Sequence, residues 1–232
     1  MLKALLTDID GTITDPTRRV HTGAVELIRS LVGNGVEVVL ASGNTSCFMD
    51  SLCRVIGTRG SFIAENGGVF RVGFDGELHL KGNQEPCRKA LGVLEAHYEK
   101  QGIRLTPLSL SYRFTDLAIA RTVPAGEIRA LLTGYPVDVI DTGYAIHLQE
   151  PGITKGTALG PLAAGMGLTP SDFIAIGDSV NDIQMLNAAG IGLAVANAHA
   201  DTKAAAQYVA EKKYGDGFVE AVKKYYPYFR AR

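Results

Sequence analysis

The chain has 232 residues, of which 46% are hydrophobic and 20% charged, and its formal net charge is −1. This composition is ordinary for a globular protein, and the length suits one large domain or a core with a small insert. Because acidic and basic residues balance, no overall field attracts nucleic acid or an anionic membrane surface, and an anion has to be bound locally. We therefore expect neither nucleic acid nor a membrane as a partner.

The three cysteines, Cys47, Cys53 and Cys87, form no metal-binding spacing. An odd number fits a reduced chain better than a disulfide framework. Asp8 comes too soon after the start for a signal peptide, and no apolar run approaches the length of a membrane span. These features predict a cytoplasmic location and leave both a monomer and a homodimer open.

Apolar runs alternate with amphipathic stretches in two parts of the chain, residues 2–80 and 153–225. Strands are predicted at residues 2–7, 36–41, 62–64, 173–176, 191–195 and 208–209, with a hairpin over residues 69–80. Helices are predicted at residues 20–31, 48–56, 155–164, 182–189, 201–206 and 218–225. Strands that are apolar throughout and separated by helices are typical of a parallel sheet buried on both faces. The predicted fold class is α/β, with a Rossmann-like doubly wound parallel sheet.

The pattern changes between Gly82 and Pro151. Helices are predicted there at residues 85–100 and 124–132, with Pro124 as a first helical residue. Strands are predicted at residues 103–105, 116–121, 137–141 and 145–149. An αββαββ order cannot continue a parallel sheet, so it indicates a separate α+β module. We expect a core of residues 1–81 and 153–232, and an inserted module of residues 82–152.

Two acidic clusters follow strands that are far apart in the sequence. Asp8-Ile9-Asp10-Gly11-Thr12 follows the first strand, and Gly177-Asp178-Ser179-Val180-Asn181-Asp182 follows the strand at residues 173–176. Ligands of open α/β sheets bind outside the carboxyl ends of the strands, so the two clusters are expected to meet there. Either cluster alone could be an Asx turn or a helix cap. Together they predict one site for a hard cation, with Asp8 and Asp178 as the expected direct ligands of Mg²⁺.

Paired carboxylates beside Mg²⁺ suit the hydrolysis of a phosphate monoester. One carboxylate attacks phosphorus to form an aspartyl-phosphate, while the other protonates the leaving oxygen and later activates water. Alternation along an extended segment places Asp8 and Asp10 on the same side, and Gly11 lets the chain turn away. The sequence therefore predicts a Mg²⁺-dependent phosphoryl-transfer enzyme.

The transferred phosphoryl group also needs cationic and hydrogen-bonding partners. Lys155, just ahead of a predicted helix, is placed to supply an ammonium, and Ser42 with the amides of Gly43 and Asn44 can supply neutral donors. Taken alone, Lys155 could be a solvated lysine, and residues 42–44 a plain turn. The segment Glu65-Asn66-Gly67-Gly68 is a further cluster expected at a strand end.

These residues resemble the motifs of the haloacid dehalogenase superfamily of phosphatases, over the whole chain. The matching motifs in chain order are Asp8-Ile9-Asp10-Gly11-Thr12, Ser42-Gly43, Lys155, and Gly177-Asp178-Ser179-Val180-Asn181-Asp182. The resemblance implies Asp8 as the nucleophile and Asp10 as the general acid/base. It implies Mg²⁺ held by Asp8, the Asp10 carbonyl and Asp178, with Asp182 in support. Lys155 would then steady the nucleophile and the phosphate, and Asn181 would contact the substrate.

The inserted module resembles the αββαββ cap of the subgroup that contains Cof-type sugar phosphatases, sucrose-phosphate phosphatase and phosphomannomutase. In its short length and its motif sequences, the chain is similar to archaeal phosphoglycolate phosphatases. The resemblance implies hydrolysis of 2-phosphoglycolate to glycolate and phosphate. Asn44 stands where many Cof-type relatives carry arginine, which removes a cation and speaks against their sugar specificity.

A cap that closes over the strand ends would exclude water and recognise the leaving group. Arg113 is the first candidate to bind a substrate carboxylate, with a solvated surface arginine as the alternative. His147, in the last strand of the module, is a further candidate to face the ligand. A phosphatase for sugar phosphates or a mannosyl-phosphoglycerate-type ester remains an alternative function. A phospho-accepting signalling module is a rival of another class, although such a module has no use for a cap.

Overall fold

The computed structural model describes residues 2–229, which form two compact units. The first unit is built from the described residues up to His79 and from Thr154 onward, and the second comprises Leu80–Ile153. The module boundaries expected from the sequence, residues 82 and 152, lie close to these positions. No helix within residues 2–229 is long and apolar enough to cross a membrane.

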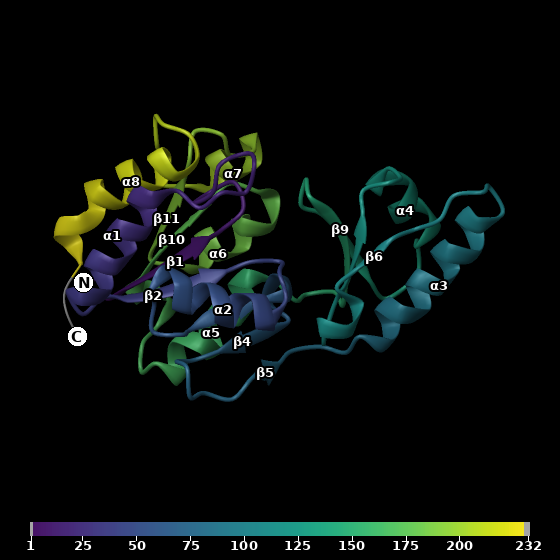
Figure 1. Ribbon diagram of the computed structural model, residues 1–232, viewed down its shortest axis with the longest axis horizontal. Coiled ribbons are helices and arrows are strands. Elements are labelled where there is room, and N and C mark those ends of the chain that lie inside the picture. The colour runs from purple at the N-terminus through teal and green to yellow at the C-terminus, as the bar shows by residue number, and fades with distance from the viewer. Residues whose placement is uncertain (1, 230–232) are drawn as a thin grey trace. The chain divides into compact units, whose positions relative to one another are not determined.

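The first unit is built on an eight-stranded sheet with the order β12-β11-β10-β1-β2-β3-β4-β5 (Figure 1). The strands from β12 to β3 run parallel, and β4 pairs with β3 in the antiparallel sense. The strand bounds are β1 Ala4–Asp8, β2 Glu37–Ala41, β3 Phe62–Ala64, β4 Val69–Arg71, β5 His79–Leu80, β10 Phe173–Gly177, β11 Ile191–Ala194 and β12 Tyr208–Val209.

Helices cover both faces of this sheet. Their bounds are α1 Thr22–Gly33, α2 Ser46–Ile56, α5 Lys155–Gly165, α6 Ile183–Ala188, α7 Ala200–Ala205 and α8 Tyr214–Tyr225. Side chains alternate along a strand, so Leu5 of β1 packs with α1, α2 and α8, whereas Ala4 and Leu6 pack with α5 and α6. Every residue of β1 is therefore buried, which explains its unbroken apolar run. The predicted α/β doubly wound sheet is confirmed.

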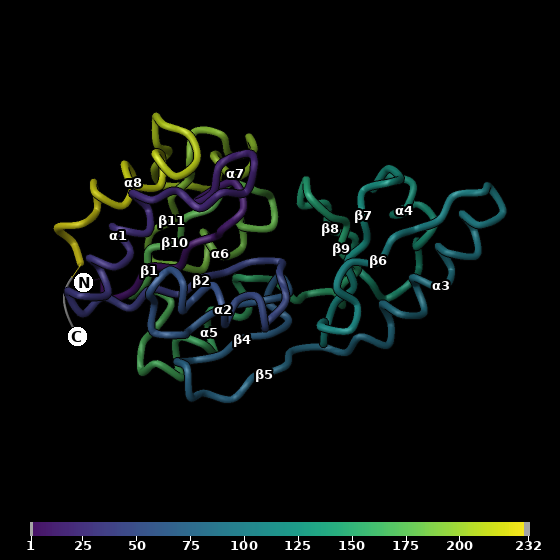
Figure 2. Tube along the Cα trace, in the orientation of Figure 1, coloured from purple at the N-terminus to yellow at the C-terminus, as the bar shows by residue number. Residues whose placement is uncertain are grey.

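The second unit is an antiparallel sheet with the order β6-β7-β9-β8 and two helices, and the trace in Figure 2 can be followed through it. Its elements are α3 Glu85–Glu99, β6 Pro107–Leu108, β7 Leu117–Ala120, α4 Ala125–Leu131, β8 Asp138–Asp141 and β9 Ala145–Gln149. The helices pack with one face of the sheet, to which β9 contributes Ile146 and Leu148. The unit has its own apolar core.

Three elements differ from the sequence-based prediction. No strand forms at residues 103–105, because pairing with β7 begins only at Pro107. Pro124 is the N-cap of α4 rather than its first helical residue, with ψ at 132°. Helix α8 begins at Tyr214, four residues earlier than expected. Gly215 lowers helix propensity there, but a side chain at this position would overlap His21.

Candidate active site

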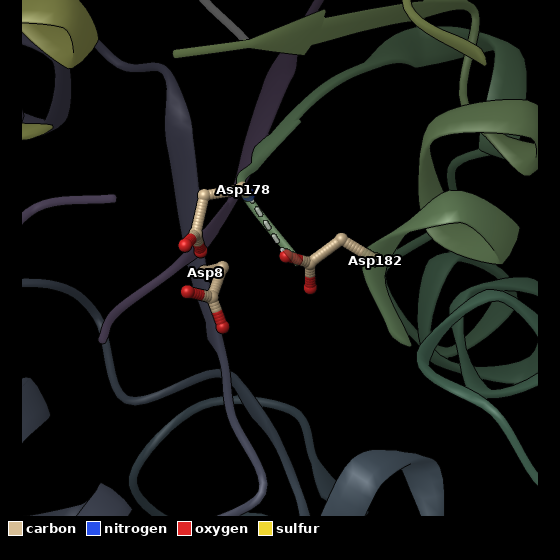
Figure 3. A group of neighbouring side chains, drawn as sticks. All are labelled: Asp8, Asp178 and Asp182. Carbon is tan, nitrogen blue, oxygen red and sulfur yellow. Dashed lines mark hydrogen bonds between the residues drawn. The ribbon is translucent and has the colours of Figure 1, made fainter. Parts of the chain in front are cut away.

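Three neighbouring parallel strands end at the same edge of the main sheet. Thr7 of β1 pairs with Ile176 of β10, and Asp8 pairs with Ala41 of β2. The residues that follow these strands, including Asp178 and Ser42, are thereby brought to Asp8. Figure 3 shows the carboxylates of Asp8, Asp178 and Asp182 facing a common space. The two acidic clusters predicted to meet at this edge do meet.

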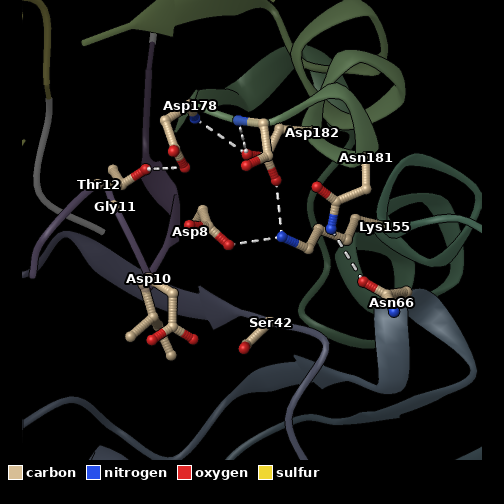
Figure 4. Close-up of polar contacts among 12 residues, drawn as sticks. Asp8, Asp10, Gly11, Thr12, Ser42, Asn66, Lys155, Asp178, Asn181 and Asp182 are labelled. Atoms are coloured by element: carbon tan, nitrogen blue, oxygen red, sulfur yellow. Dashed lines mark hydrogen bonds and ion pairs between the residues drawn. The ribbon is translucent and has the colours of Figure 1, made fainter. Parts of the chain in front are cut away.

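The carboxylates of Asp8, Asp178 and Asp182 each offer an oxygen within 4.8 Å of the others. The Lys155 ammonium lies among them, 2.6 Å from Oδ1 of Asp8 and 2.6 Å from Oδ1 of Asp182 (Figure 4). Its side chain is 1% exposed. The alternative of a solvated lysine at a helix start is therefore wrong.

The charge states in this cluster are governed by burial and by the presence of a single ammonium among three carboxylates. Burial, together with the nearby Asp182 carboxylate, raises the pKa of Asp8 well above its ordinary value, although Lys155 opposes the shift. The same two causes raise the pKa of Asp178 to about 7. Burial would lower the pKa of Lys155, but the Asp182 and Asp8 carboxylates outweigh it and raise that pKa. Three carboxylates around one ammonium leave an excess of negative charge.

This donor set fits a divalent cation with oxygen ligands. A metal ion at the carboxylates would favour their ionised forms and offset the repulsion among them. Asp8 and Asp178 are the better placed of the three, because Asp182 is already committed to other partners. Oδ2 of Asp182 accepts hydrogen bonds of 3.0 Å from the backbone N–H groups of Asp178 and Ser179, while Oδ1 accepts from Lys155. Asp182 thus orients its neighbours.

The turn after Asp10 brings the first acidic cluster against Asp178. Gly11 has φ of +89°, and a Cβ at this position would overlap the Asp178 carboxylate, so glycine is required. Thr12 donates a hydrogen bond from Oγ1 to Oδ1 of Asp178 at 3.2 Å. Thr12 was not singled out from the sequence beyond its place in the motif.

The carboxylate of Asp10 is held by the loop after β2. The amide Nδ2 of Asn44 donates to Oδ2 of Asp10 at 3.0 Å and to Oγ of Ser42 at 3.0 Å. Gly43 lies between Ser42 and Asn44 in the chain. Arg18 Nε lies 3.8 Å from Oδ1 of Asp10. The segment 42–44 is thus more than a plain turn, since it links Ser42 to the carboxylate of Asp10.

Asn197 joins this group through a contact that the sequence did not predict. Its Nδ2 donates to the carbonyl of Gly11 at 2.8 Å, and its Oδ1 accepts from the backbone N–H of Tyr214 at 2.6 Å. Asn197 lies in the loop between β11 and α7, where no local pattern distinguishes it from an ordinary loop residue. It fastens the turn after Asp10 to the start of α8.

Arg113 lies inside the second unit and is 9% exposed. Its Nη1 donates to Oδ1 of Asp116 at 2.7 Å, and its Nε donates to the carbonyl of Leu108 at 3.2 Å. Nδ1 of His147 lies 2.7 Å from the other oxygen of Asp116. Burial would raise the pKa of Asp116, but His147 and Arg113 together lower it. Arg113 is thus not a solvated surface residue, and its role in binding a leaving group stays a prediction.

Comparison with known proteins places this site in a family. The family model described as haloacid dehalogenase-like hydrolase matches residues 5–86 and 135–222. A protein of Methanoculleus marisnigri named phosphoglycolate phosphatase is 59% identical, with 100% of both chains covered. One of the same name from Methanospirillum hungatei is 50% identical, again over 100% of both chains. A crystal structure from Thermoplasma acidophilum superposes with a TM-score of 0.86 at 27% identity, covering 97% of this chain and 99% of the other. The chain belongs to the haloacid dehalogenase-like hydrolase family.

Proposed function

We propose that this protein is a Mg²⁺-dependent phosphatase that hydrolyses 2-phosphoglycolate to glycolate and phosphate through an aspartyl-phosphate. The observation that carries the chemistry is the Lys155 ammonium held between Asp8 and Asp182, with Asp178 beside them. The names of the archaeal relatives, which this chain matches over its whole length, support the substrate.

In the proposed first step, a carboxylate oxygen of Asp8 attacks phosphorus, and the bond from phosphorus to the leaving oxygen breaks. Asp10 donates a proton to that oxygen, so glycolate leaves with a neutral hydroxyl group in place of an alkoxide. In the second step, Asp10 takes a proton from water, whose oxygen attacks the aspartyl-phosphate and releases Asp8. Asp10 thus gives one proton to the leaving group and regains another from water, which restores its starting state.

The other residues hold the reacting groups in place. Lys155 fixes the orientation of Asp8 and offers its remaining N–H to the phosphoryl oxygens. Ser42, Gly43, Asn44 and Asn181 supply neutral donors around the same group. Asn44 also orients Asp10 through the 3.0 Å hydrogen bond to its carboxylate. A Mg²⁺ ion held by Asp8, the Asp10 carbonyl and Asp178 would neutralise negative charge on the phosphoryl group.

A phosphate-release screen over small phosphorylated acids and sugars, with and without Mg²⁺, tests this proposal. We expect Mg²⁺-dependent turnover, with a higher kcat/KM for 2-phosphoglycolate than for any sugar phosphate. A preference for a sugar phosphate or a mannosyl-phosphoglycerate-type ester would keep the chemistry and replace the substrate. A phosphorylated protein that lasts for minutes without turnover would instead favour a phospho-accepting signalling module. The expected cytoplasmic location stays a prediction.

A further inference from the structure

The loop after β3, Glu65-Asn66-Gly67, has a backbone that the proposed mechanism does not explain. All three residues lie in the left-handed region, with φ of 48°, 52° and 108°. Only glycine adopts this conformation without cost, although asparagine tolerates it better than most residues. Two consecutive non-glycine residues held there, both fully or almost fully buried, are backbone strain of the kind found at ligand sites.

The loop is fixed by the segments that carry the predicted substrate-binding groups. The backbone N–H of Glu65 donates to the carbonyl of Asn44 at 3.0 Å, and that of Asn66 donates to the carbonyl of Ser42 at 3.2 Å. Gly67 lies so close to the start of α5 that a Cβ would overlap the carbonyl of Thr154. Asn66 is therefore bordered by the loop of Ser42 on one side and the segment leading into Lys155 on the other.

The side chain of Asn66 continues this arrangement to Asn181. Its Oδ1 accepts a hydrogen bond of 2.9 Å from Nδ2 of Asn181, as the right of Figure 4 shows. Asn66 is 1% exposed, yet its own Nδ2 has no hydrogen-bond partner among the described residues. The Oδ1 atom of Asn181 is likewise buried and without a partner there. Buried amide groups are almost always hydrogen-bonded, so the unpartnered donor of Asn66 indicates that a ligand atom able to accept a hydrogen bond completes it.

We propose that Asn66 is a further binding residue of the phosphoryl site, which donates from Nδ2 to an oxygen of the bound phosphate and holds Asn181 through Oδ1. An oxyanion suits the unpartnered Nδ2, which has two N–H groups to donate and cannot accept. The strained loop would then serve to hold this amide beside the segments that carry Ser42 and Lys155. This inference rests on the proposed function, because it assigns a donor to the same phosphate.

Replacing Asn66 with glycine separates binding from structure. Glycine keeps the left-handed backbone without strain and removes the unpartnered buried amide, and these gains offset the lost hydrogen bond from Asn181, so the melting temperature should change by no more than about a few degrees. It should bind inorganic phosphate about 10- to 100-fold more weakly, which is the usual loss for one hydrogen bond to a charged group. A residue with a purely structural role would show the opposite, a lower melting temperature with unchanged phosphate affinity.

The experiment measures the dissociation constant of inorganic phosphate by calorimetry in the presence of Mg²⁺, well below the melting temperature of each protein. Asn34→Gly is the matched control, since Asn34 ends α1 and its side chain bonds Ser30 and Tyr226. Unchanged phosphate affinity of Asn66→Gly overturns the proposal. If the glycine variant does not fold, Asn66→Asp decides in the same assay, because it keeps the acceptor for Asn181 and loses the donor. Retained affinity in that variant overturns the proposal as well.

Turnover of p-nitrophenyl phosphate and of 2-phosphoglycolate distinguishes this inference from the proposed function. Turnover by the wild type tests the proposed function. The ratio of kcat/KM between Asn66→Gly and the wild type tests the role of Asn66. We expect kcat/KM of Asn66→Gly to fall by a similar factor for both esters, because both present the same phosphoryl group. A wild type that hydrolyses only the aryl ester would refute the substrate and leave the test of Asn66 intact.

Discussion

Lys155 Nζ lies 2.6 Å from Oδ1 of Asp8, although the two residues are 147 positions apart. The ion pair is almost entirely removed from water, since the side chains are 1% and 8% exposed. A buried ammonium in this place both orients the carboxylate of Asp8, the proposed nucleophile, and offsets part of its charge.

Asp8→Asn keeps the shape of the side chain and removes the proposed nucleophile. We expect turnover of any phosphate ester to fall by more than about 10³-fold, because no aspartyl-phosphate can form. Phosphate release in the presence of Mg²⁺ measures this. Asp75→Asn, an exposed aspartate in the turn between β4 and β5, is the matched control and should retain full activity. Near-normal turnover by Asp8→Asn would refute the mechanism.

Lys155→Met removes the ammonium and leaves Asp8 and Asp182 as buried carboxylates without a cation. Breaking a buried ion pair from one side costs about 3–5 kcal/mol. We expect a clear loss of thermal stability without metal, and a larger stabilisation by added Mg²⁺ than in the wild type. Melting curves with and without Mg²⁺ test this. An unchanged melting temperature would contradict the buried ion pairs.

Asp178→Asn should stabilise the metal-free protein at neutral pH. The pKa of Asp178 is raised to about 7 by burial and by Asp182, whereas the pKa of an aspartate in the unfolded chain is about 4. Between these values the folded protein binds the proton more strongly, so its stability falls as pH rises toward 7. Replacing the carboxylate removes this loss. The melting temperature of the variant should exceed that of the wild type by more at pH 8 than at pH 5.

The difference should reach several degrees at pH 8, since 1 kcal/mol corresponds to about 2–4 °C in a chain of this size. The same variant should lose most of the stabilisation that Mg²⁺ confers on the wild type. Comparing variant with wild type at each pH cancels the titration of the histidines. A difference that is equal at both pH values would mean that Asp178 does not carry the raised pKa.

Asn197→Asp tests the link between the turn after Asp10 and α8. Aspartate retains an acceptor for the N–H of Tyr214 but cannot donate to the carbonyl of Gly11. We expect kcat to fall by about 10- to 100-fold through misplacement of Asp10, with the fold retained. Steady-state kinetics and circular dichroism give the two readings. Full kcat would show that the Gly11 carbonyl needs no such support.

Arg113→Met separates the structural part of Arg113 from its predicted role in binding the leaving group. The single variant leaves Asp116 buried without its arginine and should lose about 3–5 kcal/mol of stability. The double variant Arg113→Met/Asp116→Asn removes the uncompensated charge and should recover most of that loss. If KM for 2-phosphoglycolate is then normal, Arg113 does not bind the substrate. A raised KM in the stable double variant would support the prediction.

The sequence by itself determined the αβ alternation, the place where the second unit interrupts it, and the two acidic clusters. These features are local, because an apolar run that ends in Asp8 or Gly177 carries its own signal of a buried strand and a strand-end loop. Prediction from the sequence was less reliable where contacts with neighbouring elements set the ends of a helix or strand. The start of α8 depends on the space beside His21, and β6 depends on pairing with β7.

Only the tertiary structure decided which polar side chains are partners. Lys155 is buried between Asp8 and Asp182, and Asn66 is bonded to Asn181. Arg113 is paired with Asp116, which no surface argument could have shown. Spacing along the chain says which loops follow strands, but the order of the strands in the sheet decides which of those loops meet. The contacts made there set burial and charge, and through them the chemistry of each residue.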